Sequence, residues 1–185
     1  MQEKTAQKAA LRRELLANRQ AIPTEVRRRA DALIGTHVLA WHKMHPVGSM
    51  GVYWPIRGEP DLLECYAALS ALGVRLALPI VVDKHSPLRF LTWKPGDAMT
   101  KDSLGVAIPV AGDEVQPEAL LVPCVGFNDA RFRLGYGGGF YDRTLERAPR
   151  PLTVGIAYEC ARSRFDADAH DVALDYLVTE KETPA

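Results

Sequence analysis

The spacing of apolar residues changes from helical to strand-like near Val47. Over residues 3–19 the apolar positions recur at helical spacing, which predicts an amphipathic helix. Pro23 and Thr24 break this pattern. A second helix is predicted to follow, with Thr24 as its N-cap and with its end before Pro46. The basic side chains that we expect on the polar side of the first helix are Arg12, Arg13 and Arg19.

Short apolar runs follow, separated by turn residues and by two further helical patterns. The helical patterns cover 61–72, ended by Gly73, and a segment that begins near Phe140. A strand, a helix and a strand in succession imply parallel pairing. The chain is therefore predicted to form a single α/β domain over residues 1–185, with three layers and a mostly parallel sheet flanked by helices. The predicted strands are 47–53, 74–81, 88–93, 119–123, 153–158 and 176–179.

Composition excludes several classes of protein. The 23 basic and 23 acidic residues cancel, which gives no general reason to bind nucleic acid or an anionic membrane. Without a signal-like start or an apolar run of roughly 20 residues, the protein is expected to be soluble and cytoplasmic. The 3 cysteines are far apart and are expected to be free thiols. Arginines 27–29 lack neighbouring stacking aromatics, so they favour a solvated helix face over an RNA site.

A cluster of glycines lies between the predicted strand at 119–123 and the helix that begins near Phe140. Without β-carbons, backbone N–H groups there can turn toward an anion. The Walker and dinucleotide-binding patterns are both absent, so a flexible surface turn and a phosphate-binding loop both remain open. Flanking donors and rings favour the phosphate-binding loop. The glycines are Gly135, Gly137, Gly138 and Gly139, and the flanking residues are Arg133, Tyr136, Tyr141, Asp142 and Arg143.

The run RLGYGGGFYDR, residues 133–143, closely resembles the signature of bacterial 5-formyltetrahydrofolate cyclo-ligases. The resemblance implies an ATP- and Mg²⁺-dependent ligase that converts 5-formyltetrahydrofolate to 5,10-methenyltetrahydrofolate, releasing ADP and phosphate. It also implies a substrate that can carry a polyglutamate tail, and a monomer is favoured over an oligomer. Further similar stretches, in the family's order, are KAALR at 8–12, RGEPDLLE at 57–64, PLRFLTWKPGD at 87–97 and HDVALDYLVTE at 170–180.

In the family's chemistry, the resemblance implies, the formyl oxygen attacks the γ-phosphate of ATP, and N10 then attacks the carbon of the resulting iminium phosphate. Such a reaction depends on positioning and charge neutralisation. The resemblance implies ATP contacts from Lys8, Arg12, Arg133, Leu134, Gly135, Tyr136, Gly137, Gly138, Gly139, Phe140 and Tyr141. It implies substrate contacts from Trp54, Glu59, Tyr136 and Phe140. The residues expected to act in catalysis are Glu59, Arg133 and Tyr136.

Two aspartates are expected on the metal side of the site by the same resemblance. Asp142 matches a Mg²⁺ ligand, although the first turn of a helix favours a carboxylate on electrostatic grounds alone. Asp171 matches a second metal-side position. Glu59 matches a folate contact that could orient N10 or take its proton, with a solvated loop acid as the alternative. Trp54 could stack on a ring of the substrate or simply close the core.

Three positions depart from the family pattern, and two rival functions remain. Many relatives have glycine in place of Cys124 and Arg131, and aspartate in place of Asn128. The turn at Arg131 must therefore differ, or be strained if a positive φ is retained. Asn128 lacks the charge that an aspartate could offer a metal. The rivals are a non-catalytic folate- or nucleotide-binding relative and another enzyme on a scaffold like those of sugar-phosphate isomerases or CoA transferases.

Overall fold

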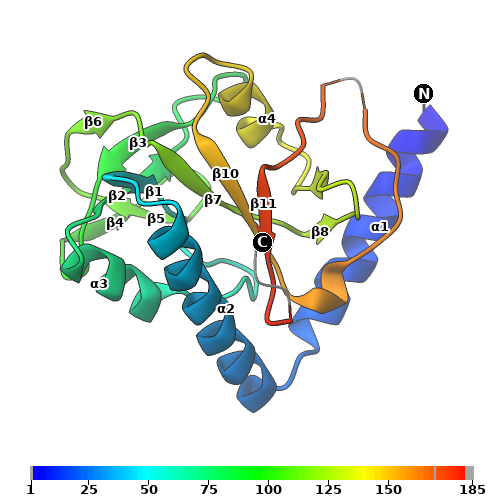
Figure 1. Ribbon diagram of the computed structural model, residues 1–185. Helices are drawn as coiled ribbons and strands as arrows, with labels where there is room; N and C mark the ends of the chain where they lie inside the picture. Colours follow the sequence, from blue (N-terminus) through cyan, green and yellow to red (C-terminus); the bar gives the residue numbers. More distant parts are fainter. Residues whose placement is uncertain (1, 169, 182–185) are drawn as a thin grey trace.

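A mostly parallel sheet forms the centre of the protein in the computed structural model, which describes residues 2–168 and 170–181 (Figure 1). Within these residues the sheet has seven strands in the order β11-β10-β7-β1-β2-β3-β6. Strands β11 to β2 pair in parallel, and β3 and β6 add an antiparallel edge. The predicted fold class is confirmed. The strands are β1 Ser49–Gly51, β2 Arg75–Ile80, β3 Arg89–Thr92, β6 Glu114–Val115, β7 Ala119–Pro123, β10 Leu152–Ile156 and β11 Tyr176–Val178.

The two N-terminal helices are present as predicted, α1 at Gln2–Gln20 and α2 at Thr24–Met44. Thr24 as the N-cap of α2 is wrong. Pro23 occupies that position with φ −59° and ψ 144°, and Thr24 is the first helical residue. The fixed φ of proline together with its extended ψ ends the preceding turn without a side-chain cap. The other helices are α3 Leu63–Ala71, α4 Phe140–Leu145 and the 3-10 turn Glu159–Ala161.

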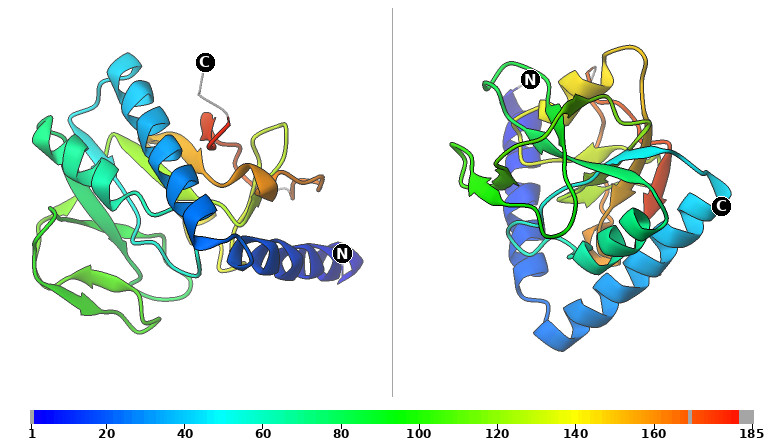
Figure 2. Two further views of the ribbon diagram at one scale, coloured as in Figure 1. Left: turned by 90° about the horizontal axis from the view of Figure 1, so that it is seen from below. Right: turned by 90° about the vertical axis from the view of Figure 1, so that its left-hand side faces the viewer.

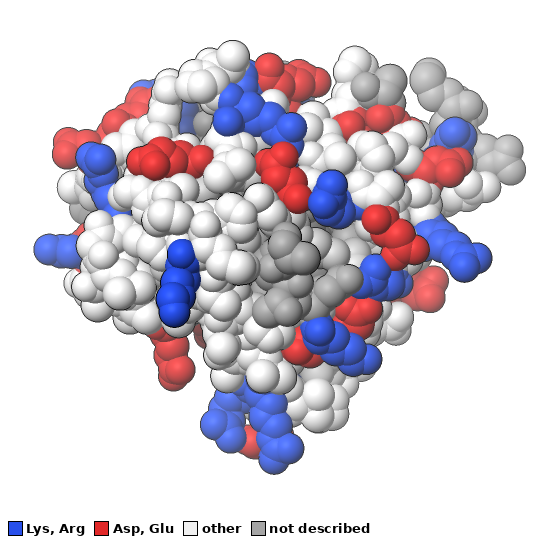
Figure 3. All heavy atoms as spheres, viewed as in Figure 1, with Lys and Arg blue, Asp and Glu red and all other residues white. Residues whose placement is uncertain are grey.

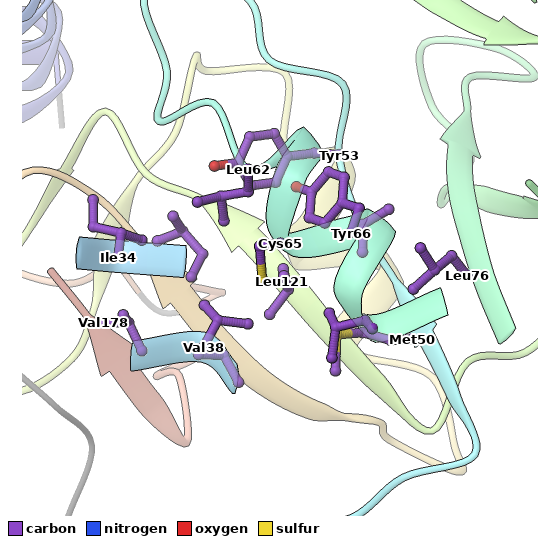
Figure 4. Packing of buried hydrophobic residues seen from close by; sticks show 14 of the residues in the cluster. Ile34, Val38, Met50, Tyr53, Leu62, Cys65, Tyr66, Leu76, Leu121 and Val178 are labelled. Carbon is purple, nitrogen blue, oxygen red and sulfur yellow. The ribbon is translucent and has the colours of Figure 1, made fainter. Parts of the chain in front are cut away.

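Helices α2 and α3 cover one face of the sheet (Figure 4). Ile34 and Val38 of α2 and Tyr66 of α3 are fully buried against strand residues such as Leu121. Each large apolar side chain buried in this way stabilises the fold by roughly 1.5–3 kcal/mol. The buried side of α2 follows the helical spacing seen in the sequence, through Ala30, Ile34, Val38 and Trp41, whereas Leu33, which we expected on the same side, is 48% exposed.

The opposite face of the sheet is covered by α4 and by loops. Leu120 and Val122 of β7 point to this side, where they pack with Leu145 of α4 and with Phe127 and Leu174. Strand β7 is thus apolar on both sides, as expected for a central parallel strand between two layers.

Helix α1 lies beside these layers and extends away from them (Figures 1 and 2). Its apolar contact is a smaller cluster in which Leu15 packs against Val125 and Leu134, with Leu11 and Leu16 at the margin. Because α1 runs past the ends of the central strands, its other side chains can reach the loops that follow them.

Two short hairpins were not predicted. One pairs β4 (Met99–Lys101) with β5 (Ala107–Pro109), and the other pairs β8 (Gly126–Phe127) with β9 (Arg133–Leu134). Strands of two or three residues are too short to show an alternating pattern. In the part of the chain that the structure describes, no helix combines the length and the apolar character that a membrane crossing requires.

Candidate active site

A cavity of about 260 Å³ opens beyond the carboxyl ends of β1 and β7. Its walls come from α1, from the loop after β1 and from the glycine-rich loop that leads into α4. Ligands of parallel α/β sheets bind at this end. All the ligand-contacting residues proposed from the sequence line this cavity: Lys8, Arg12, Trp54, Glu59, Arg133, Leu134, Gly135, Tyr136, Gly137, Gly138, Gly139, Phe140, Tyr141, Asp142 and Asp171.

The glycine-rich loop has a shape that only glycine allows at several positions. Gly137 has φ +95° and Gly139 has φ +66°, both in the left-handed region. A β-carbon on Gly138 would lie 2.8 Å from the ring of Phe140. Arg143 holds the loop from outside, donating to the carbonyl of Gly138 at 2.8 Å. Glycine is therefore favoured at these positions by backbone angle and by close approach, which gives the loop its particular shape.

Arg133 is a buried cation with an unused donor. Its Nη2 donates to Oδ1 of Asp142 at 2.7 Å, and the side chain is only 5% exposed. Its Nη1 is buried without a hydrogen-bond partner among the described residues. A buried guanidinium N–H strongly favours an acceptor, and an anionic oxygen in the adjoining cavity would provide one.

Two further cations enter the cavity from α1. Nζ of Lys8 lies 2.6 Å from Asp168 and 2.9 Å from Asp171. Burial lowers the pKa of Lys8, but hydrogen bonds and the charges of these two carboxylates more than offset it, so the net pKa is raised and the amine stays protonated. Nε of Arg12 donates to the carbonyl of Gly135 at 2.8 Å, joining α1 to the glycine-rich loop.

Glu59 lies at the inner end of the cavity and is only 4% exposed. Its Oε2 accepts the N–H of Ile56 at 2.9 Å, and its Oε1 accepts the hydroxyl of Tyr136 at 2.7 Å. Burial raises the pKa of Glu59, and the hydrogen bonds with Ile56 and Tyr136 and the charges of Arg19 and Arg57 partly oppose this rise. The alternative of a solvated loop acid is wrong, since the strand end and glycine-rich loop enclose the side chain.

Arg19 was missed as part of this region. We expected it on the polar side of the first helix, but the structure buries it to 3% exposure beneath the glycine-rich loop. A signal was present, because Arg19 follows Leu11 and Leu15 at intervals of four residues and so shares their side of α1. Charge alone suggested the wrong side.

Other cavity residues were also missed. Asp168 pairs with Lys8, and the loop between β4 and β5 contributes Asp102, Leu104 and Val106. That loop follows no recognisable motif, so its approach to the cavity depends on the fold. Trp54 lines the cavity while its ring packs edge-on against Trp93, with 6.1 Å between centroids, so it contributes to the core, and its contact with the substrate stays a prediction.

The positions that depart from the family pattern belong mainly to the β8–β9 hairpin. Arg131 has φ +61°, so the positive φ is retained and the strained alternative holds. Asn128 accepts the N–H of Phe132 at 3.0 Å and donates Nδ2 to the carbonyl of Phe165 at 3.0 Å, a bond that an aspartate could not make. Cys124 is buried, which raises the pKa of its thiol to about 12, as expected for a packing residue.

Comparisons with known proteins agree with one another. The sequence profile of the 5-formyltetrahydrofolate cyclo-ligase family matches residues 4–180. Curated 5-formyltetrahydrofolate cyclo-ligases of Mycoplasma pneumoniae and Mycolicibacterium smegmatis are 28% and 29% identical; each alignment covers 94% of this chain, and 99% and 94% of the relatives.

Two solved structures resemble the fold. Both are described as 5,10-methenyltetrahydrofolate synthetases. That from Mycoplasma pneumoniae has a TM-score of 0.80 at 26% identity, covering 94% of this chain and 98% of its own. That from Aquifex aeolicus has a TM-score of 0.82 at 30% identity, covering 96% and 91%. The similarity thus extends well beyond the glycine-rich motif.

Proposed function

Because this chain belongs to the 5-formyltetrahydrofolate cyclo-ligase family, it is an ATP-dependent ligase that closes 5-formyltetrahydrofolate to 5,10-methenyltetrahydrofolate, and we propose that the cavity beside α1 is its active site. The observation that carries this proposal is the meeting of cations, a glycine-rich loop and a buried carboxylate in one cavity. Each corresponds to one requirement of the reaction.

The triphosphate is proposed to lie against the glycine-rich loop. Backbone N–H groups of residues 135–139 supply donors, and Lys8, Arg12 and Arg133 supply positive charge. The unused Nη1 of Arg133 is the strongest single support, because a phosphate oxygen would satisfy it.

The folate is proposed to occupy the apolar side of the same cavity. Tyr53, Trp54 and Ile56 form one part of this wall, and Leu88 and Leu104 form another. Glu59 lies at its inner end, where a carboxylate could accept a hydrogen bond from N10. The cavity has a volume of about 260 Å³ and is open to solvent, so the substrates would lie partly outside it.

The proposed reaction sequence is the one that membership of the family implies. The formyl oxygen attacks the γ-phosphate, ADP leaves, and the cations neutralise the charge on the transferred group. N10 then attacks the activated carbon and loses its proton, and phosphate leaves as the methenyl bridge closes. Glu59 orients N10 and receives the proton, for which its raised pKa is suited. Tyr136 fixes the carboxylate by donating to it.

Asp142 and Asp171 are proposed to lie on the Mg²⁺ side of the site. Among the described residues, no group of three or more His, Cys, Asp or Glu side chains could hold a metal by itself. Both carboxylates line the cavity and already pair with Arg133 and Lys8, so they fit an ion that takes its other ligands from phosphates and water. When bound, such an ion neutralises phosphate charge.

The remaining features of the proposal follow from charge and from the make-up of the site. We propose that residues 1–185 act as one domain, built around the central sheet, and that the protein is a cytoplasmic monomer. Basic and acidic side chains are interspersed over the face in Figure 3, which supports neither nucleic-acid nor membrane binding. A folate with a polyglutamate tail would project that tail from the open side of the cavity.

An absorbance assay for the methenyl product tests the proposed function. Purified protein with 5-formyltetrahydrofolate, ATP and Mg²⁺ is expected to produce the methenyl absorbance together with one ADP per product, and reactions lacking ATP should produce none. ATP or folate binding without turnover would instead indicate a non-catalytic relative. Turnover of a sugar phosphate or a CoA ester, with no methenyl product, would indicate the rival scaffold enzymes.

A further inference from the structure

One guanidinium joins three segments that build the folate side of the cavity. Arg19 is 3% exposed, and its Nε donates to the carbonyl of Arg57 at 3.2 Å. Its Nη1 donates to the carbonyl of Cys124 at 3.4 Å, and its Nη2 donates to the hydroxyl of Tyr136 at 2.5 Å. The side chain thus ties the loop after β1, the end of β7 and the glycine-rich loop to α1.

The contact with Tyr136 determines the direction of the next hydrogen bond. A phenol has one proton, and because its oxygen accepts from Arg19, that proton is free to go to Oε1 of Glu59, 2.7 Å away. The guanidinium of Arg19 also lies 5.8 Å from the centroid of the Tyr136 ring, and that of Arg57 lies 5.3 Å from it. Arg19 and Arg57 thus both lie against the Tyr136 ring, and Arg19 also holds its hydroxyl.

We propose that Arg19 is a positioning residue for the folate half of the reaction, acting on Glu59 through Tyr136. This inference rests on the proposed function, because Glu59 is the group that would receive the N10 proton. Arg19 lines no part of the cavity itself. Its influence on Glu59 therefore comes through the hydroxyl of Tyr136, with its positive charge acting on Glu59 in addition.

The charges around Glu59 give this role a signature in pH dependence. Burial raises the pKa of Glu59, and Arg19 and Arg57 both oppose the rise. Removing the charge of Arg19 should therefore raise the pKa further, and the acid limb of kcat/KM for the folate should move to higher pH. The other titratable groups that act electrostatically with Glu59 are Tyr53, Tyr66, Cys124, Tyr136 and Tyr141, whose pKa values are all raised by burial.

The test uses Arg19→Met, which keeps an aliphatic side chain and removes every donor, with Arg13→Met on the exposed side of α1 as the control. Arg19→Met is expected to lower kcat about tenfold or more, to shift the acid limb upward and to leave the KM for ATP unchanged. The control should match the wild type in all three. A rise in the KM for ATP with no shift of the acid limb would overturn the inference.

A double-mutant cycle covers the case in which Arg19→Met folds poorly. Arg19→Lys keeps the charge but cannot reach three acceptors, and it is combined with Tyr136→Phe, which removes the connecting hydroxyl. Arg19→Lys should lower kcat in the wild type and should have little further effect in Tyr136→Phe. Equal effects in both backgrounds would mean that Arg19 only supports the fold. Absence of methenyl formation by the wild type would refute the proposed function, a separate outcome from either result.

Discussion

In the proposed mechanism Glu59 takes a proton from N10 and must be deprotonated although it is buried, and two hydrogen-bond donors and two nearby guanidinium groups favour its charged form. Its raised pKa makes it a stronger base than an exposed glutamate, and the charges of Arg19 and Arg57 limit the rise of that pKa. The balance between these effects sets the lowest pH at which the enzyme can work.

Glu59→Gln should therefore lower kcat by about 10²–10⁴-fold and leave the KM for ATP unchanged, because glutamine can hold the same shape but cannot accept the proton. In the wild type, kcat/KM should fall as pH drops through the raised pKa of Glu59. This acid limb of the profile should be absent from the variant. Steady-state kinetics across pH measure both effects, with Glu14→Gln on the exposed side of α1 as the control. Unchanged turnover would remove Glu59 from the mechanism.

Asp142 combines two interactions that differ in magnitude. As a partner of the α4 dipole it would stabilise the fold by roughly 0.3–1 kcal/mol, whereas as a Mg²⁺ ligand it would govern the metal requirement. Asp142→Asn should fold, with a small drop in Tm, and should need more Mg²⁺ for half-maximal rate. Titrating Mg²⁺ at fixed ATP and folate measures this, with Asp113→Asn as an exposed control. A lower Tm with an unchanged Mg²⁺ curve would leave Asp142 a structural partner of Arg133.

At the scale of elements, long periodic segments were predicted well and short ones were not. α1 and α2 were predicted because each repeats its pattern over several turns, and the glycine-rich loop because its motif is specific. The strand predicted at 47–53 is observed as β1, Ser49–Gly51, because only the middle of the predicted segment pairs with both neighbouring strands. The two short hairpins had no pattern to read. Tertiary contacts, not local propensity, determine such pieces.

The residues of the candidate site also separate into those that the sequence predicted and those that it missed. The residues of the motif were found because their identity and spacing are specific, and the structure brings them all to one cavity. Arg19 and the loop carrying Leu104 were missed because their approach to the cavity results from how α1 and the β4–β5 hairpin pack. That packing cannot be predicted from the pattern of a single sequence.

The β8–β9 hairpin contains a strain that a single substitution can relieve. Arg131 at φ +61° carries a penalty of about 1–2 kcal/mol relative to glycine, whereas glycine loses about 0.5–1 kcal/mol more conformational entropy on folding. Arg131→Gly should therefore raise the free energy of unfolding by about 0.5–1 kcal/mol. Urea unfolding measures it, and Arg131→Ala, which keeps the β-carbon, should give no such gain. Equal midpoints for the two variants would contradict the strain.

At the scale of the whole molecule, buried carboxylates shape the dependence of stability on pH. Asp31 of α2 accepts the hydroxyl of Tyr158 at 2.6 Å, across the sheet face that α2 covers. Burial raises its pKa above the ordinary value of 3.8, outweighing the hydrogen bond from Tyr158. A carboxyl with a raised folded pKa contributes stability that is complete below pH 3.8 and is lost as pH rises through the folded value.

Asp31→Asn keeps an acceptor for Tyr158 and has no charge at any pH. Relative to the wild type, its free energy of unfolding should increase as pH rises from 3.8 and should then level off above the folded pKa of Asp31. Denaturant unfolding at a series of pH values measures the difference between the two proteins. A difference that stays constant across that series would show that Asp31 does not titrate between the folded and unfolded states as proposed.

Helix α1 carries Lys8, Arg12 and Arg19, yet its apolar anchor is the smallest of the three buried clusters formed by the residues that the structure describes. Segments with few buried apolar contacts open most readily in native proteins, and their amide hydrogens exchange through such openings. Substrates that bind between α1 and the glycine-rich loop should make local opening of α1 rarer. When ATP and folate are bound, the amides of α1 should therefore gain more protection from hydrogen exchange than the amides of α2. Product release would then be limited by the same local opening that exchange reports.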